Sequence, residues 1–191
     1  NNDPWRELLP NLFRLGRLPR LMKEGHLDAV AVSASSYTTG EHVTFYDSAK
    51  PIEPWARSQR ISVQDQLSVD HLMASSAIPF VFPAVPLSIG GRQHYFGDGA
   101  MRQAAPISPA IHLGADRILV IGAGRLHEPQ TPREGSAEYP SLAQIAGHAM
   151  SSIFLDALAV DIERMQRVNK TLELLPPEIR EKSALRPVDV L

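Results

Sequence analysis

The chain has 191 residues, of which 43% are hydrophobic and 21% are charged, values typical of a soluble globular domain that is long enough to bury a core. Its net charge is −2 with both signs mixed along the chain, so the clustered basic face of a nucleic-acid-binding protein is not expected. Cysteine is absent, which excludes disulfides and thiolate metal sites and fits a reducing compartment, and no apolar run approaches the roughly 18 residues of a membrane span.

The first third of the chain predicts short helices followed by a hairpin. Leucines recur at three- and four-residue spacings over residues 5–24, where prolines divide the helical pattern into pieces. Residues 27–33 read as a buried strand and 42–46 as a second one, joined by a turn at 37–41. Residues 48–66 are polar and contain proline, so we expect a loop there.

The middle of the chain predicts one helix and a second hairpin. Ser68 is suited to cap a helix that ends near Ile78, because the residue before Pro79 is disfavoured in the helical region. Gly90 and Gly91 separate two strand-like runs, 87–89 and 94–96, which is the pattern of a tight β-hairpin. The second run leads directly into Asp98.

The remaining residues predict a buried strand and a long helix. Residues 106–112 read as a short helix, and the apolar run 118–121 is typical of a strand covered on both faces. Residues 123–140, which include Ser136, read as a surface loop. Ser141 and Gln144 form a capping box for a helix from residue 142 to about 172, followed by a short helix over 178–183.

The apolar residues of the long helix fall into two rows. We expect the first row to pack on the sheet and the second to lie buried beside it. The first comprises Leu142, Ile145, Ala149, Ile153, Ala157 and Val160, and the second Phe154, Leu158, Ile162 and Met165. Strands that alternate with helices predict an α/β sheet covered on both sides, within a single domain over residues 1–191.

The segment Gly97-Asp98-Gly99-Ala100 is the most informative motif. A carboxylate between two glycines at the end of a strand lies where open α/β sheets place their ligands, and glycine permits close approach of another group to the acid. An ordinary Asp-Gly turn would give the same four residues.

Several segments in the same order resemble the patatin-like phospholipase family. Beyond the strand at 29–33 and the turn at Thr39-Gly40, the matching blocks are 74–79, 82–83, 96–100, 106–110, 113–116 and 118–122. The resemblance implies an α/β/α sandwich around a mostly parallel sheet. It implies as well that this chain is a patatin-like domain truncated at its N-terminus. It also implies hydrolysis of lipid acyl esters by a serine and an aspartate without histidine, and the aspartate of the family's motif corresponds to Asp98.

Such a dyad has simple chemical requirements. A serine hydroxyl is a weak nucleophile unless a neighbouring group accepts its proton, and burial raises the pKa of a carboxylate toward the range where it acts as a base. Gly97 and Gly99 would give the backbone its close approach to the serine, and Ala100 completes the motif. Separate backbone N–H groups, from a glycine-rich loop in this family, would stabilise the oxyanion.

The sequence departs from the family pattern in one respect. No Gly-x-Ser-x-Gly segment and no glycine-rich oxyanion loop occur in the 191 residues. The chain does not start with Met, and residues 186–191 read as a strand that stops early, so we expect a piece of a longer protein whose serine precedes residue 1. We therefore expect no esterase activity from this piece alone.

Other candidate residues favour structural roles. Ser75 and Ser76 lack a glycine-flanked turn, Arg102 is expected in solvent, and the seven histidines show no metal-binding spacing, so no metal or other cofactor is predicted. The expected partner is a lipid acyl ester, with transient contact to a membrane surface, no nucleic acid, and a cytoplasmic or peripheral membrane location. A truncated sheet would favour self-association. The alternative is a non-catalytic α/β module that binds a lipid or a protein.

Overall fold

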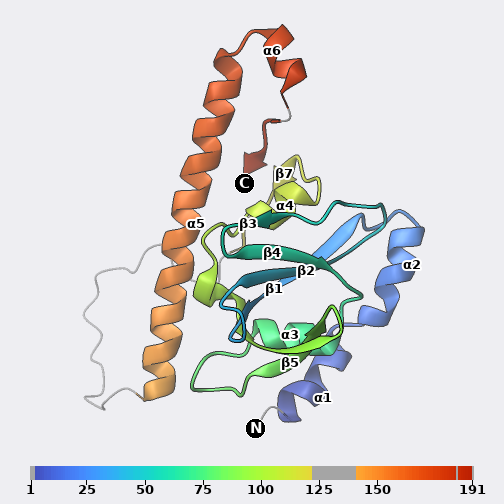
Figure 1. The fold of residues 1–191 in the computed structure, drawn as a ribbon, viewed down its shortest axis with the longest axis vertical. Helices are drawn as coiled ribbons and strands as arrows, with labels where there is room; N and C mark the ends of the chain where they lie inside the picture. Colours follow the sequence, from blue (N-terminus) through green and yellow to red (C-terminus); the bar gives the residue numbers. More distant parts are fainter. Residues whose placement is uncertain (1–2, 122–140, 184, 191) are drawn as a thin grey trace. The chain divides into compact units, whose positions relative to one another are not determined.

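A computed structural model describes residues 3–121, 141–183 and 185–190 (Figure 1). The predicted surface loop 123–140, with Ser136, lies outside the described residues. The chain divides into two compact units, residues 1–103 and 104–191, and each is described by itself below. The expectation of one domain over residues 1–191 stays a prediction.

The first unit contains three α-helices and two short 3₁₀ turns among its described residues. Pro10 lies inside the first helix rather than ending it, whereas Pro19 occupies the first turn of the second, where its missing N–H costs nothing. The elements are α1 (Asp3–Leu12), η1 (Leu15–Arg17), α2 (Leu18–Lys23), α3 (Val69–Ser75) and η2 (Gly99–Arg102).

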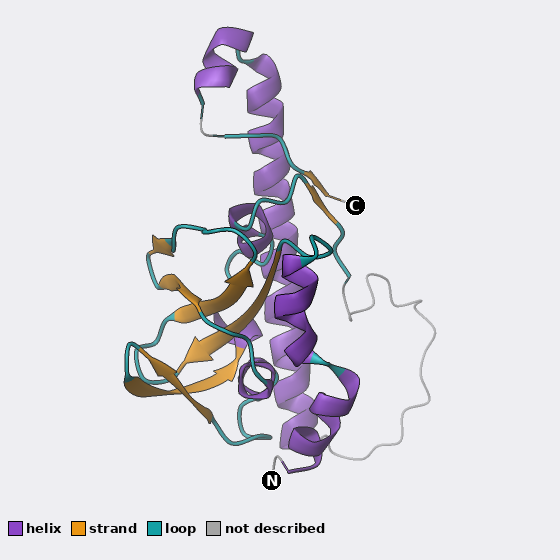
Figure 2. Cartoon of the chain, turned by 90° about the vertical axis from the view of Figure 1, so that its right-hand side faces the viewer, coloured by secondary structure: helices purple, strands orange, loops and turns teal. Residues whose placement is uncertain are grey.

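Six strands of this unit form one sheet in the order β3-β4-β2-β1-β6-β5. Figure 2 shows the strands in orange. Only β2 and β4 run parallel, so the expectation of a mostly parallel sheet is wrong for this unit. The chain reverses through tight turns between most neighbouring strands, and tight turns join antiparallel strands. The strands are β1 (Ala29–Ser36), β2 (His42–Ser48), β3 (Ala56–Arg57), β4 (Arg60–Gln64), β5 (Val85–Ile89) and β6 (Arg92–Asp98).

Both predicted hairpins are confirmed. Strands β1 and β2 pair antiparallel, as do β5 and β6, whose two-residue turn has positive φ at both Gly90 and Gly91. The predicted loop 48–66 is wrong in part, because it contains β3 and β4. Strand β4 takes its place in the sheet by pairing parallel with β2, a contact between distant residues that local sequence does not reveal.

Helix α3 packs on one face of the sheet, and α1 packs on α3 and adds Leu9 to the same core. Phe45 and Phe96 lie edge to face with centroids 5.4 Å apart, and Met73 and Ala74 of α3 are buried in the same cluster. Ser68 caps α3 as predicted: its hydroxyl and backbone N–H both contact Nδ1 of the buried His71, at 2.9 and 3.1 Å. This packing fixes the end of α3 near β6.

The second unit is organised around one long helix. As predicted, Ser141 and Gln144 form the capping box that starts α5 (Leu142–Leu174), and the short helix near residue 178 is present as α6 (Pro177–Lys182). The other elements are α4 (Ser108–His112), β7 (Arg117–Ile118) and β8 (Asp189–Val190), with β7 and β8 parallel.

Two expectations for this unit are wrong. The apolar run 118–121 is a strand only at Ile118, and Leu119 and Ile121 are exposed. Among the described residues, β7 pairs with the two-residue strand β8 alone. In α5, Leu158 and Met165 of the second apolar row are buried, whereas Ile145 and Val160 of the first row are exposed. The side chains of Leu142, Ala149, Ile153 and Phe154 lie outside the described residues.

Candidate functional site

Asp98 is the last residue of β6, and it also starts the turn η2. Its register partner on β1 is Ala34, and its backbone N–H donates to the carbonyl of Ala77 at 3.0 Å. Its Oδ1 accepts a hydrogen bond from the N–H of Ala100 at 2.8 Å, which makes Asp98 the N-cap of η2. The structure thus ties together two motifs that the sequence analysis selected, 74–79 and 97–100.

The glycines on either side of Asp98 are required by close contacts. A Cβ atom on Gly97 would collide with the phenol of Tyr37, and one on Gly99 would collide with the backbone carbonyl of Ser33. Neither glycine has positive φ, so the requirement is for space rather than for backbone conformation. The groups that fill this space are Tyr37 and β1, and the expected approach of a serine to the glycines stays a prediction.

Burial dominates the electrostatics of Asp98. The side chain is half-buried, and burial raises the pKa of the carboxyl above its usual range, while the hydrogen bond from Ala100 acts in the opposite direction. No cation forms an ion pair with Asp98 among the described residues. A carboxylate in this state is more basic than an exposed one, as a general base requires.

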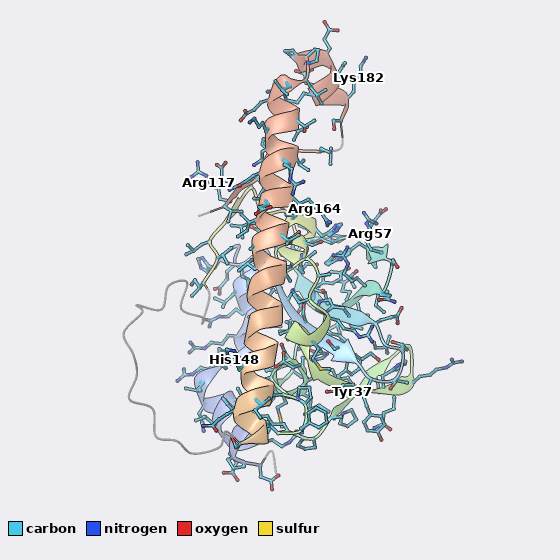
Figure 3. The ribbon with its side chains drawn as sticks, turned by 90° about the vertical axis from the view of Figure 1, so that its left-hand side faces the viewer. Tyr37, Arg57, Arg117, His148, Arg164 and Lys182 are labelled. Atoms are coloured by element: carbon cyan, nitrogen blue, oxygen red, sulfur yellow. The ribbon has the colours of Figure 1, made fainter. Side chains whose placement is uncertain are left out.

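Tyr37 is a site residue that the sequence analysis placed only in a turn. Its hydroxyl donates to the sulfur of Met101 at 3.6 Å, and 47% of the residue is exposed on the surface, where Figure 3 labels it. Burial of the phenol and the negative charge of Asp98 both raise its pKa. Its position in a turn gave no sign that the ring would lie beside the acid motif.

His42 lies on the other side of the same turn and was also missed. It is 4% exposed, and its pKa is lowered to about 4, mainly by burial and further by the Arg60 cation, although the Gly99 carbonyl and the Gln103 side chain favour protonation. An isolated histidine at the start of a strand carries no distinctive sequence signal.

The serines near the motif have structural partners. Ser76 follows α3 and donates its hydroxyl back to the carbonyl of Leu72 at 2.9 Å, as expected for a residue that ends a helix. The hollow beside Ser76 and Ala77 has a volume of about 10 Å³, too small for an acyl group. Ser75 is the last residue of α3, so neither serine lies on a strand-turn-helix elbow.

Arg102 and the histidines of the described residues add no second site. Arg102 is exposed and its guanidinium lies over Gly40. In the described part of the chain no three His, Asp or Glu side chains are grouped so that they could hold a metal ion. None of the described helices has the length and apolar character needed to cross a bilayer.

Comparison with known proteins gives no further assignment. No protein-family model matches the chain, and searches of curated proteins and of solved structures find no significant match. The site therefore rests on its own geometry. It combines a half-buried carboxylate and two glycines whose missing side chains leave room for close contacts, with a phenol and a buried imidazole nearby.

Proposed function

We propose that this chain carries the general base of a serine acyl hydrolase, with Asp98 as the base, in the manner of the patatin-like family that its motifs resemble. The supporting observation is the state of Asp98: its carboxyl is half-buried, no cation pairs with it among the described residues, and burial raises its pKa. A structural aspartate of a tight turn would ordinarily remain in solvent at its usual pKa.

In the proposed reaction Asp98 accepts the proton of a serine hydroxyl as that oxygen attacks the acyl carbon. The protonated acid then returns the proton to the departing alcohol, and the cycle repeats with water. Because the 191 residues contain no Gly-x-Ser-x-Gly segment, the proposal requires the serine and the oxyanion donors to come from polypeptide outside them. The substrate class is a fatty-acyl ester of a phospholipid or neutral lipid.

The test compares Asp98→Asn with a matched control in the natural gene product that contains this chain. The control is Asp28→Asn, because Asp28 is also an aspartate of the first unit but is exposed. Turnover of a p-nitrophenyl ester and labelling by a fluorophosphonate, which reports an activated serine, are expected to fall about 10²–10⁴-fold in Asp98→Asn and to stay unchanged in Asp28→Asn.

The 191-residue chain provides the complementary measurement. It is expected to show neither ester turnover nor fluorophosphonate labelling. Turnover by this chain that Asp98→Asn abolishes would disprove the external serine, and unchanged turnover of the natural protein with Asp98→Asn would disprove the role of Asp98.

A second candidate function is a non-catalytic module that binds a lipid surface. The observation that favours it is Phe80, whose ring is 96% exposed in the loop after α3. Flotation with phosphatidylcholine vesicles distinguishes the candidates: a binding module would bind vesicles in a Phe80-dependent way, and the natural protein would show no ester turnover.

A further inference from the structure

Helix α1, labelled in blue in Figure 1, exposes a stripe of large apolar side chains. Trp5, Leu8 and Leu12 recur at three- and four-residue spacings and therefore share one side of the helix. Phe13 extends the stripe past the helix end, where its backbone N–H still donates to the carbonyl of Leu9 at 2.8 Å. Leu12 and Phe13 are the most exposed members, at 61% and 51%. Large apolar side chains gathered in solvent mark an interaction surface.

Basic side chains follow this apolar stripe directly along the chain. They recur every third residue through η1 and α2, so that consecutive cations are neighbours on the surface of the segment. The cations, all exposed, are Arg14, Arg17, Arg20 and Lys23. No acidic residue occurs between Glu7 and Glu24. Arg20 pairs with Glu24 at 3.5 Å, and the other three cations form no ion pair within the described part of the chain.

The two groups meet at Phe13 and Arg14, so one surface carries large apolar side chains next to a row of cations. A nucleic acid or an acidic peptide would match the cations and leave the leucines in water. The apolar face of another protein would match the leucines and leave the cations without partners. An anionic membrane matches both, because its headgroups attract lysine and arginine while the boundary beneath them accepts tryptophan, phenylalanine and leucine.

We infer that residues 5–23 form a docking surface for anionic phospholipid bilayers. Leu8, Leu12 and Phe13 enter the boundary between headgroups and acyl chains, and the cations of residues 14–23 bind the lipid phosphates. The contact is peripheral, since none of the described helices has the character of a membrane span. This inference goes beyond the proposed function, because it requires neither Asp98 nor a serine.

The test measures binding of the 191-residue chain to lipid vesicles by co-sedimentation. Vesicles of equimolar phosphatidylcholine and phosphatidylglycerol are expected to bind the chain at least about tenfold more tightly than vesicles of phosphatidylcholine alone, because each cation gains from the negative surface potential. Added salt is expected to weaken the binding by screening that potential. Equal binding to the two kinds of vesicle, or binding to neither, would overturn the inference.

A pair of arginine variants tests the basic row. Arg14→Gln/Arg17→Gln is expected to weaken binding to the anionic vesicles by about tenfold or more. The matched control is Arg57→Gln/Arg92→Gln, which removes two exposed arginines of the same unit outside the docking surface and is expected to change binding little. Equal losses in the two double variants would mean that overall charge alone drives binding, and would overturn the inference.

A second pair tests the apolar stripe and separates a membrane from a soluble polyanion. Leu12→Gln/Phe13→Gln is expected to weaken binding to the anionic vesicles by about tenfold, since binding scales with the apolar area that enters the bilayer. Leu119→Gln/Leu174→Gln, at exposed leucines of the second unit, is the control and should bind as the unmodified chain does. Full binding by Leu12→Gln/Phe13→Gln would identify a site for polyanions in general and overturn the inference.

Trp5 gives a direct measurement of insertion. The sequence contains two tryptophans, so Trp55→Phe leaves Trp5 as the single one. On anionic vesicles its emission is expected to shift to the blue and to be quenched by lipids brominated on their acyl chains. Tight binding without quenching would place the contact elsewhere and overturn the inference. None of these measurements uses ester turnover, so failure of the docking surface is distinguishable from failure of the proposed function.

Discussion

The hydroxyl of Tyr37 lies directly over the backbone of Gly97, in contact so close that a methyl group at position 97 would overlap it. The contact joins the residue after β1 to the residue before Asp98, and Tyr37 also donates its backbone N–H to the carbonyl of Tyr95 at 2.8 Å. The ring therefore covers one side of the acid motif, and the absence of a side chain at position 97 is a condition for that cover.

Gly97→Ala is accordingly expected to destabilise the chain by about 1–3 kcal/mol, the usual cost of inserting a methyl group into a filled space. Urea unfolding measures the effect. Gly16→Ala is the control, because no atom lies within 4 Å of a Cβ placed there. In the double variant Tyr37→Ala/Gly97→Ala most of the loss should disappear, and equal losses with and without the tyrosine ring would contradict the contact.

Gly99→Ala is expected to be more damaging than Gly97→Ala. The group that a Cβ at Gly99 would meet is the carbonyl of Ser33 in β1, which is main chain and cannot rotate away as a tyrosine ring can. The turn would have to lift from the strand, with a loss of stability above about 3 kcal/mol. Thermal unfolding of the two glycine variants side by side checks the order, and a reversed order would show that the turn is free to shift.

Asp98→Asn is expected to stabilise the fold while it abolishes the proposed activity. Burial disfavours the charged form of Asp98, and an asparagine oxygen still accepts the hydrogen bond from Ala100 without carrying that charge. The unfolding free energy at pH 7 is expected to rise by about 0.5–2 kcal/mol. Asp28→Asn should leave stability unchanged, and a destabilised Asp98→Asn would mean that the carboxylate is held by favourable interactions instead.

Stability is expected to fall as the pH is lowered from about 6.5 to about 4. An unfolded histidine binds its proton near pH 6.5, whereas the pKa of His42 in the folded chain is about 4, so the unfolded state binds more protons in this interval. The loss between pH 7 and 4.5 is about 2–3 kcal/mol. Asp98 changes the stability in the opposite direction. Because its pKa is raised in the folded chain, the folded state binds this proton at a higher pH than the unfolded state does.

The comparison of the unmodified chain with His42→Gln isolates the histidine contribution to this pH dependence. Urea unfolding at pH 7 and 4.5 is expected to show a smaller acid loss in His42→Gln, since glutamine does not titrate. The buried His71, whose pKa is also lowered, remains in both proteins and contributes equally to them. Identical acid losses in the two proteins would rule out His42 as their source.

Local patterns predicted the local structure. The Gly90-Gly91 turn, the cap at Ser68 and the capping box of α5 are each fixed by a few neighbouring residues, and all three are present. Strand β4 escaped prediction because Ile61 and Val63 stand in a polar stretch, and their strand forms through pairing with β2. The direction of the strands depends on such pairings, so the mostly parallel sheet expected from the resemblance was wrong for the first unit.

The candidate site, too, was predicted where its signal is local and missed where it depends on strand pairing. Asp98 and its glycines were selected because their spacing within one tetrapeptide carries the signal. Tyr37 and His42 join the site through the register between β1, β2 and β6, which brings residues about 60 positions apart in sequence to one turn. No local pattern encodes that register, so single-sequence reasoning found the acid and missed its neighbours.

Phe80 offers a last prediction, because its backbone is strained. Its φ is 66°, in the left-handed region that aromatic residues rarely occupy, and its side chain is 96% exposed, so no packing compensates. Asparagine tolerates this conformation, and Phe80→Asn is expected to raise the unfolding free energy by about 0.5–1 kcal/mol. Leu12→Asn, at a leucine 61% exposed on α1, is the control for removing an exposed apolar side chain and should give no gain. A loss of stability in Phe80→Asn would show that the ring makes contacts in solution that offset the strain.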